Sequence, residues 1–256
     1  MSVPPEEAVD PVGEVFKHIN GHKFDLGPWP TNTHLVMSVL VTALLLFVLI
    51  RFARRMRARG AGAPQGILDN LLESFVVFVR DEIVKPNMGP HAEHYAHFLL
   101  SVFFFILFAN LAGMVPACAS PTGNFGVTAA LALVTFAYGA IQGVRAQGAG
   151  HYLKNLAPAG VPGAILVILY PIEVVGLVIK HAVLAVRLFA NMVAGHLVIG
   201  ILLALPALMG VRAIAGPAYG LAAGIVLLDV FVAFLQAYVF TMLASLFIGA
   251  QVHPEH

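Results

Sequence analysis

Long apolar runs separated by short polar stretches dominate the sequence. Each run is at least about as long as the 17 to 25 residues that a helix needs to cross the apolar core of a bilayer. The runs predict membrane-embedded helices at 34–52, 97–117, 126–144, 163–205 and 217–250. The pattern therefore predicts an all-α integral membrane protein with about five membrane-embedded helices.

A sixth helical segment, residues 67–85, has a different pattern. Apolar pairs such as Ile67 and Leu68 alternate at helical spacing with polar residues such as Asp69 and Glu73. A helix with one apolar and one charged face lies along a membrane surface more readily than it spans the bilayer. We expect an amphipathic interfacial helix here.

Two of the runs are too long for an upright crossing. No proline interrupts residues 172–205, and a helix over that interval would be about 50 Å long. One crossing by such a helix needs a tilt of roughly 50°, beyond the roughly 0 to 40° of ordinary spans. With the run at 217–250 it predicts a long oblique hairpin against a large partner. The alternative, two half-length helices, lacks a strong breaker between Gly176 and Gly195.

Charge sets the expected orientation. The first run ends in an arginine cluster, which the positive-inside rule places in the cytoplasm. Residues 1–33 then form a polar tail outside, and residues 34–256 form a single polytopic membrane domain whose C-terminus is cytoplasmic. The arginines of the cluster are Arg51, Arg54, Arg55, Arg57 and Arg59.

Composition agrees with the apolar pattern and excludes several functions. Mean hydropathy is +0.88, and 59% of residues are hydrophobic against 11% charged, far from a soluble domain. A net charge of +1 without a dense basic field argues against binding nucleic acid. The single cysteine, Cys118, allows no internal disulfide or cysteine metal cluster. The histidines His91, His94 and His97 have no supporting ligand set beyond Glu93. We expect no metal and no cofactor.

Polar residues recur on one face of the long run. Glu173, Lys180 and Arg187 are seven residues apart, which places them within about 40° of one another on a helix. Asn191 follows one turn later on the same stripe. A charge at mid-membrane costs at least about 2.5 to 3.5 kcal/mol, so we favour a functional role over mutual hydrogen bonding within a bundle.

The last run has its own polar face. Asp229 and Gln236 are again seven residues apart, and His196 of the preceding run is about half a turn from the Arg187 stripe. We expect His196 to point toward the last helix.

Arg187 has no acid nearby in its own helix. Glu173 is about 21 Å away along the axis, and a guanidinium stays protonated under any ordinary condition. Two hypotheses remain for its counter-charge: a structural ion pair with Asp229, or a carboxylate on a partner subunit that visits Arg187.

The block "RLFANMVAGH" at 187–196, preceded by Glu173 and Lys180, resembles the a-subunit family of rotary F-type ATP synthases. The stretches "FANLAGMVP", "PTGNFGVTAALAL" and "LLDVFVAFLQAYVFTML" resemble other blocks of that family, in the same order. The resemblance implies a stator proton-channel subunit of the bacterial inner membrane, which binds no nucleotide and is no enzyme by itself. Its implied partners are the c-subunit ring, the b subunits of the peripheral stalk, the remaining F1F0 subunits and the lipid bilayer.

The resemblance also implies roles for individual residues. Arg187 would face the ring carboxylates, whereas Glu173, with Lys180 and His181, would belong to the half-channel open to the cytoplasm. The residues of the half-channel open to the outside would be Asn191, His196, Asp229 and Gln236.

Three positions depart from the family pattern. His181 and Val183 stand where many members have proline and serine, and Gly113 stands where some members have an acid. Asp229 would then provide more of the charge in the outer pathway.

The electrostatics suggest how such a subunit works. A carboxylic acid is stable in lipid when neutral, whereas an adjacent arginine and access to water favour its ionised form. Two half-channels that each reach only midway then force a proton to travel around the ring, with proton preferred over sodium. The main alternative is a secondary transporter whose Arg187 binds an anionic solute, which predicts inverted repeats or broken helices. A purely structural membrane subunit is a further alternative.

Overall fold

The computed structural model describes residues 23–26, 29–59, 66–89, 92–115, 120–155 and 163–252. Residues 1–22 of the predicted outer tail, His91, Cys118 and the C-terminal residues 253–256 lie outside this described part. The orientation expected for the two termini therefore remains a prediction.

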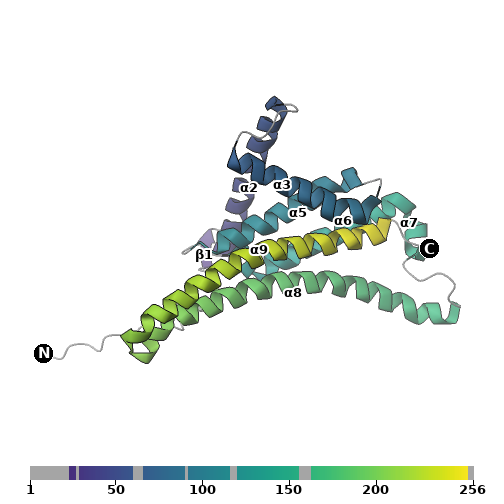
Figure 1. The fold of residues 1–256 in the computed structure, drawn as a ribbon. Helices are drawn as coiled ribbons and strands as arrows, with labels where there is room; N and C mark the ends of the chain where they lie inside the picture. The colour runs from purple at the N-terminus through teal and green to yellow at the C-terminus, as the bar shows by residue number, and fades with distance from the viewer. Residues whose placement is uncertain are drawn as a thin grey trace.

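The described chain is almost entirely helical (Figure 1). A short hairpin precedes the first helix, where the sequence had predicted only a polar tail. In chain order the elements are β1 (Lys23–Leu26), β2 (Trp29–Asn32), α2 (Thr33–Arg59), α3 (Ile67–Phe78), the π-helix η1 (Val79–Val84), α4 (Lys85–Met88), α5 (Ala92–Gly113), the 3₁₀ turn η3 (Pro121–Gly123), α6 (Phe125–Gln147), α7 (Ala149–Asn155), α8 (Gly163–Met209), the 3₁₀ turn η4 (Arg212–Ile214) and α9 (Ala215–Val252).

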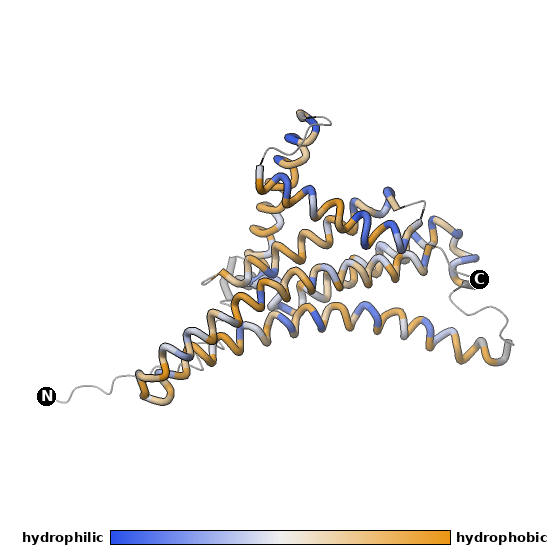
Figure 2. Tube along the Cα trace, in the orientation of Figure 1, coloured by the Kyte–Doolittle hydropathy of each residue, from blue (hydrophilic) through white to orange (hydrophobic). Residues whose placement is uncertain are grey.

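Five of the described helices are long and apolar enough to cross a membrane, namely α2, α5, α6, α8 and α9. This confirms the predicted fold class. In Figure 2 their residues are mostly hydrophobic, and polar residues occur as isolated positions along α8.

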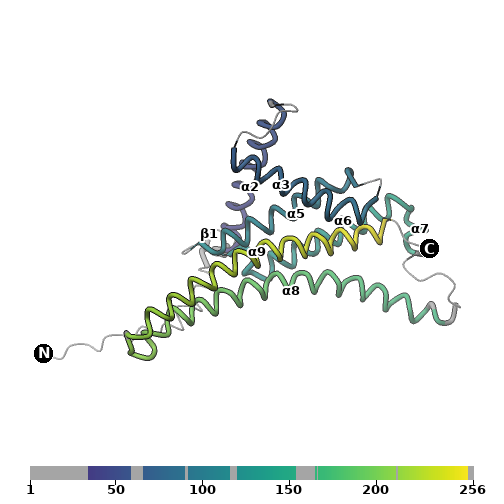
Figure 3. The backbone as a smooth tube through the Cα atoms, viewed as in Figure 1, coloured from purple at the N-terminus to yellow at the C-terminus, as the bar shows by residue number. Residues whose placement is uncertain are grey.

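The last two helices form the predicted long hairpin. α8 has 47 residues and α9 has 38, so they extend about 70 Å and 57 Å. They lie side by side and are joined through η4, as the tube in Figure 3 shows. α8 is continuous, so the alternative of two half-length helices is wrong. It also passes through Pro171 and Pro206 and extends beyond the predicted end at residue 205.

α5 is the centre of the packing, and α8 is at its edge. In the most apolar 18-residue window of each helix, 56% of residues are buried in α5 but only 11% in α8 and 17% in α9. The side chains of Leu99, Phe103 and Ile106 on α5 are fully buried. α5 packs on α9, η1 and α2, whereas α2 rises at a steep angle from this layer (Figure 1).

The predicted amphipathic segment is helical, but its two halves differ. Ile67 and Leu68 at the start of α3 are 88% and 75% exposed, whereas Val79 and Ile83 of η1 are completely buried against α5 and α9. Two side chains donate to the Ile83 carbonyl within this π-turn, Asn87 Nδ2 at 2.7 Å and Ser245 Oγ at 3.3 Å. The second half is therefore anchored by protein.

The end of α9 is fixed by a polar contact with α6 and α7. Gln147 Nε2 donates to the Gln251 carbonyl at 2.7 Å, and the Tyr152 hydroxyl donates to Gln251 Oε1 at 3.1 Å. Burial raises the pKa of the Tyr152 phenol, so the hydroxyl keeps the proton that it donates. A methyl group at Gly143 would lie 2.6 Å from the Tyr152 ring, which explains the need for glycine at this close approach.

Candidate functional site

Arg187 lies on the outer surface of α8. The buried neighbours Leu184 and Leu188 face the bundle, whereas Arg187 is exposed together with Val183 and Val186. Among the described residues, no carboxylate lies within ion-pair distance of the Arg187 guanidinium. The described chain thus lacks the structural Arg187–Asp229 pair that the sequence left open.

The rest of the α8 stripe follows the same surface. Lys180 is exposed, and Glu173 and Asn191 are half-buried. The Lys180 ammonium lies 5.9 Å from the centre of the Phe247 ring on α9, close enough for a cation–π contact. These side chains share one helix but are spread along it, so they form a stripe and not a compact cluster.

Asp229 lies in the seam between α8 and α9. A methyl group placed on Gly195 would be 2.6 Å from Asp229 Oδ2 and 3.2 Å from its carboxyl carbon. Only a glycine on α8 leaves this space for the carboxylate. The neighbouring His196 interacts electrostatically with Asp229, and its Nε2 atom is shielded from solvent. The structure therefore brings His196 and Asp229 together, as expected for a histidine that points toward the last helix.

Gln236 extends the α9 face two turns beyond Asp229. Its side chain is only 5% exposed, and its Nε2 atom has no hydrogen-bond partner in the described chain. A buried amide that lacks a partner is costly, so this position favours contact with water or with another polar molecule.

His181 does not share the Arg187 surface. It is 4% exposed, its Nδ1 atom lies 2.9 Å from the Leu177 carbonyl, and its ring contacts Phe136 of α6 and Phe247 of α9. The side chain is enclosed between three helices and does not reach toward a membrane interface.

A group of hydrogen-bonded side chains near the C-terminal end of α5 was not predicted from the sequence. Thr122 Oγ1 donates to Asn110 Oδ1 at 2.8 Å, and it lies 3.1 Å from Ser120 Oγ. Asn110 Nδ2 reaches the Ala233 carbonyl of α9 at 3.5 Å, and His34 Nδ1 lies 2.8 Å from the Ser120 carbonyl. We call His34, Asn110, Ser120 and Thr122 the α5–η3 polar network. The sequence does show these four polar residues within or beside apolar runs. Only the fold shows that they lie together.

The sequence matches the family described as ATP synthase A chain over residues 35–249. The chain belongs to the ATP synthase A chain family. It is 48% identical to "ATP synthase subunit a" of Myxococcus xanthus over 87% of this chain and 73% of that protein. It is 40% identical to the protein of that name from Chloroherpeton thalassium, over 93% and 76% of the two chains. With "ATP synthase subunit a" of Anaeromyxobacter dehalogenans the identity is 44%, over 89% and 58%.

Family membership fixes the general role. This member is a multi-pass membrane protein of the F0 sector of a bacterial ATP synthase, a non-catalytic subunit that couples proton flow to rotation. It is part of the F1F0 complex.

The glycine at position 113 has a structural reason in this member of the family. A side chain on Gly113 would collide with the Met192 methyl group and lie 2.6 Å from Ser120 Oγ. An acid at this position therefore requires the side chains of Met192 and Ser120 to shift. Asp229 is the carboxylate that the α8–α9 seam does accommodate.

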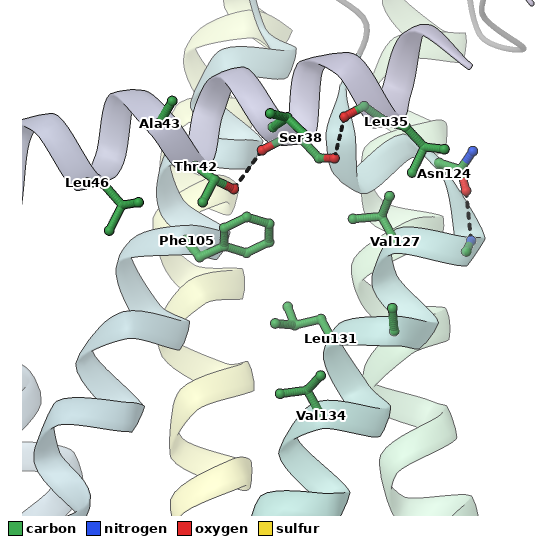
Figure 4. Close-up of a pocket in the computed structure, with 13 residues that line it drawn as sticks. Leu35, Ser38, Thr42, Ala43, Leu46, Phe105, Asn124, Val127, Leu131 and Val134 are labelled. Carbon is green, nitrogen blue, oxygen red and sulfur yellow. Dashed lines mark hydrogen bonds between the residues drawn. The ribbon is translucent and has the colours of Figure 1, made fainter. Parts of the chain in front are cut away.

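A groove of about 660 Å³ between α2, α5 and α6 holds none of the predicted site residues (Figure 4). Its walls are mainly apolar, and the hydroxyls of Ser38 and Thr42 donate at 2.7 Å to carbonyls of their own helix. Among the described residues, no three metal-ligating side chains lie together. The groove and the metal-ligating side chains of the described residues therefore suggest no charged site besides the stripe of α8 and the α8–α9 seam.

Proposed function

We propose that Arg187 is the stator charge that faces a ring of c subunits and drives their carboxylates to release protons. The observation that supports this most is an exposed guanidinium amid apolar side chains, without a carboxylate partner in the described chain. A charge in that setting costs at least about 2.5 to 3.5 kcal/mol unless it is matched. A carboxylate on a moving neighbour matches it without permanent pairing.

Two groups of polar residues lie on opposite sides of Arg187 along α8. His196, with Asp229 of α9 beside it, lies about 14 Å toward the C-terminal end of α8. With Asn191 and Gln236, these two residues would line the outer half-channel. Glu173 lies about 21 Å toward the other end, where Lys180 and His181 would complete the inner half-channel. A proton that enters one half-channel then reaches the other only by riding on the ring.

The exposed face of the hairpin suits a large apolar partner. On α8, Val183 and Val186 beside Arg187 are 48% and 50% exposed, and on α9 Leu227 and Phe231 are 74% and 60% exposed. Oblique helices present this face along a curved ring. We place the chain in the inner membrane with the N-terminus outside, and we assign b subunits of the peripheral stalk and lipid as further neighbours.

Crosslinking tests this assignment directly. In a chain whose Cys118 is replaced by serine, Val186→Cys and a cysteine near the rotor carboxylate should form a disulfide on oxidation and block ATP-driven rotation until reduced. Val39→Cys on α2, which is 68% exposed at the native residue, is the matched control and should not crosslink. Absence of the Val186 crosslink in an assembled complex contradicts the proposal.

A secondary transporter of an anionic solute is less well supported. That mechanism uses discontinuous helices at the binding site, whereas α8 and α9 are continuous through Arg187 and Asp229. Purification distinguishes the two: a ring of small subunits that copurifies supports the stator role, and a monomer that transports solute opposes it.

A further inference from the structure

We propose that the corner between the end of α2 and the start of α3 binds an anionic phospholipid. The phosphate of this lipid lies against arginines of α2, and its acyl chains lie along exposed apolar side chains of the two helices. The corner is separate from the stripe of α8 and from the α8–α9 seam. The inference therefore goes beyond the proposed function and does not depend on the role of Arg187.

One face of α2 presents an apolar part followed by a basic part. Leu44 and Phe47 are 52% and 63% exposed, and Arg51 and Arg54, which follow them, are also exposed. These four positions lie within about 80° of one another on a helix. From Leu44 to Arg54 the axis rises about 15 Å, which is half of a bilayer core of about 30 Å. The face therefore has the length of one leaflet, with the charges at the end where lipid headgroups lie.

The start of α3 forms the second wall of the corner. Arg55 Nη1 lies 3.3 Å from Asp69 Oδ2 and 3.4 Å from Asp69 Oδ1, so this ion pair connects the last turns of α2 to the first turn of α3. The strongly exposed Ile67 and Leu68 directly precede Asp69. From there α3 runs away from α2 at a steep angle (Figure 1). The ion pair thus places apolar side chains of α3 beside the basic end of α2.

The balance of charge at this corner favours an anion. The exposed arginines are Arg51, Arg54, Arg55 and Arg57, whereas the acids of α3 are only Asp69 and Glu73. In the part of the chain that the structure describes, Arg51 and Arg54 have no carboxylate within ion-pair distance. A guanidinium presents its N–H donors in a planar fork that matches a phosphate. These two arginines are therefore suited to a phosphate that comes from outside the described chain.

The apolar side chains make a lipid a better occupant than a protein. Arginines at the end of a span could simply stay in water on one side of the membrane. An acidic protein surface would match Arg54 but leave Phe47 bare, and an apolar helix would cover Phe47 but leave Arg54 unmatched. A phospholipid carries both chemistries in one molecule, in the order in which α2 presents them. It would also add contacts to a helix whose most apolar window is only 11% buried.

Photolabelling of the complete complex tests the site. The complex is reconstituted in phosphatidylcholine vesicles that contain a small amount of phosphatidylglycerol with a photoreactive acyl chain. Phosphatidylcholine with the same photoreactive chain is the reference probe. After illumination, peptide mapping locates the labelled residues of this chain. We expect the anionic probe to label residues 44–50 and 67–71 at least about tenfold more than the neutral probe, because each arginine near an anionic lipid adds about a fivefold preference.

Removing two charges should remove most of this preference. In the variant that combines Arg51→Gln with Arg54→Gln, the ratio of anionic to neutral labelling at these residues should fall at least about fivefold. Labelling by the neutral probe should stay the same, because the apolar side chains remain. Arg145→Gln, which removes an exposed arginine at the end of α6, is the control and should leave the ratio at α2 and α3 unchanged.

The outcomes decide for or against the lipid. Equal labelling by the two probes in the unmodified complex overturns the inference, as does an unchanged ratio in the glutamine pair. Absence of both labels at these residues overturns it as well, because another subunit of the complex would then cover the corner. If the glutamine pair does not assemble, Arg54→Gln alone decides, with an expected fall of several-fold.

Discussion

The surface stripe and the seam of α8 present their polar residues to different surroundings. Arg187 and Lys180 lie exposed among apolar side chains, and the described chain supplies no carboxylate for Arg187. Asp229 is half-buried in the seam between α8 and α9, where Gly195 makes space for it and His196 lies beside it. The seam residues thus meet one another within the chain, whereas the role that we propose for Arg187 requires a second molecule. The proposed function uses both regions, the seam as a fixed route for protons and Arg187 as a charge that meets a moving partner.

Removing the charge of the stripe should have the largest effect. Arg187→Ala should lower ATP synthesis and ATP-driven proton pumping to background, because no charge remains to drive ionisation of a ring carboxylate. The complex should still assemble, since Arg187 makes no ion pair in the described chain. Pumping and synthesis are measured in vesicles, with Val183→Ala on the same exposed face as the control. Normal coupled synthesis in Arg187→Ala would refute the assigned role.

Removing the charge of the seam should have the next largest effect. Asp229→Asn keeps the shape of the side chain in the space beside Gly195 but cannot exchange a proton. We expect proton flow through the complex to fall about hundredfold, the lower end of the usual loss for a proton-transfer group. Asp229→Glu, which retains a carboxylate, should keep more of the flow. Equal losses in both variants would mean that shape, and not charge, matters here.

The sequence predicted the polar stripe of α8 but not the surroundings of its residues. The stripe was predictable, because residues seven apart share a helical face whatever packs on it. Its exposure and the absence of a described ion pair with Asp229 were left open, because helix spacing does not reveal which neighbour a side chain meets. The enclosure of His181 and the α5–η3 polar network also required the fold, since Asn110 and Ala233 are 123 residues apart. The π-turn of η1 left no pattern in the sequence that marks it.

A single methyl group should test the fit of the seam. Gly195→Ala places a carbon 2.6 Å from Asp229 Oδ2, so the carboxylate must move. We expect proton flow to fall several-fold, less than in Asp229→Asn because the acid remains. The matched control is Gly176→Ala on the same helix, which meets nothing within 4 Å and removes only a helix-weakening glycine, worth up to about 1 kcal/mol. Equal flow in the two variants would show that Asp229 does not depend on this space.

A tight contact outside both regions should affect stability and leave proton flow unchanged. Gly249→Ala on α9 brings a methyl group 2.6 Å from the Asn87 carbonyl oxygen, and backbone cannot yield as a flexible side chain can. We expect a loss of stability of about 1 to 3 kcal/mol, as for other overpacked sites, with unchanged proton flow per assembled complex. Gly224→Ala, which meets nothing within 4 Å, serves as the control. Thermal inactivation and vesicle pumping together provide the measurement. If Gly249→Ala lowered the flow as much as Gly195→Ala, the loss at Gly195 would reflect general overpacking of the hairpin, and the distinction between seam and scaffold would fail.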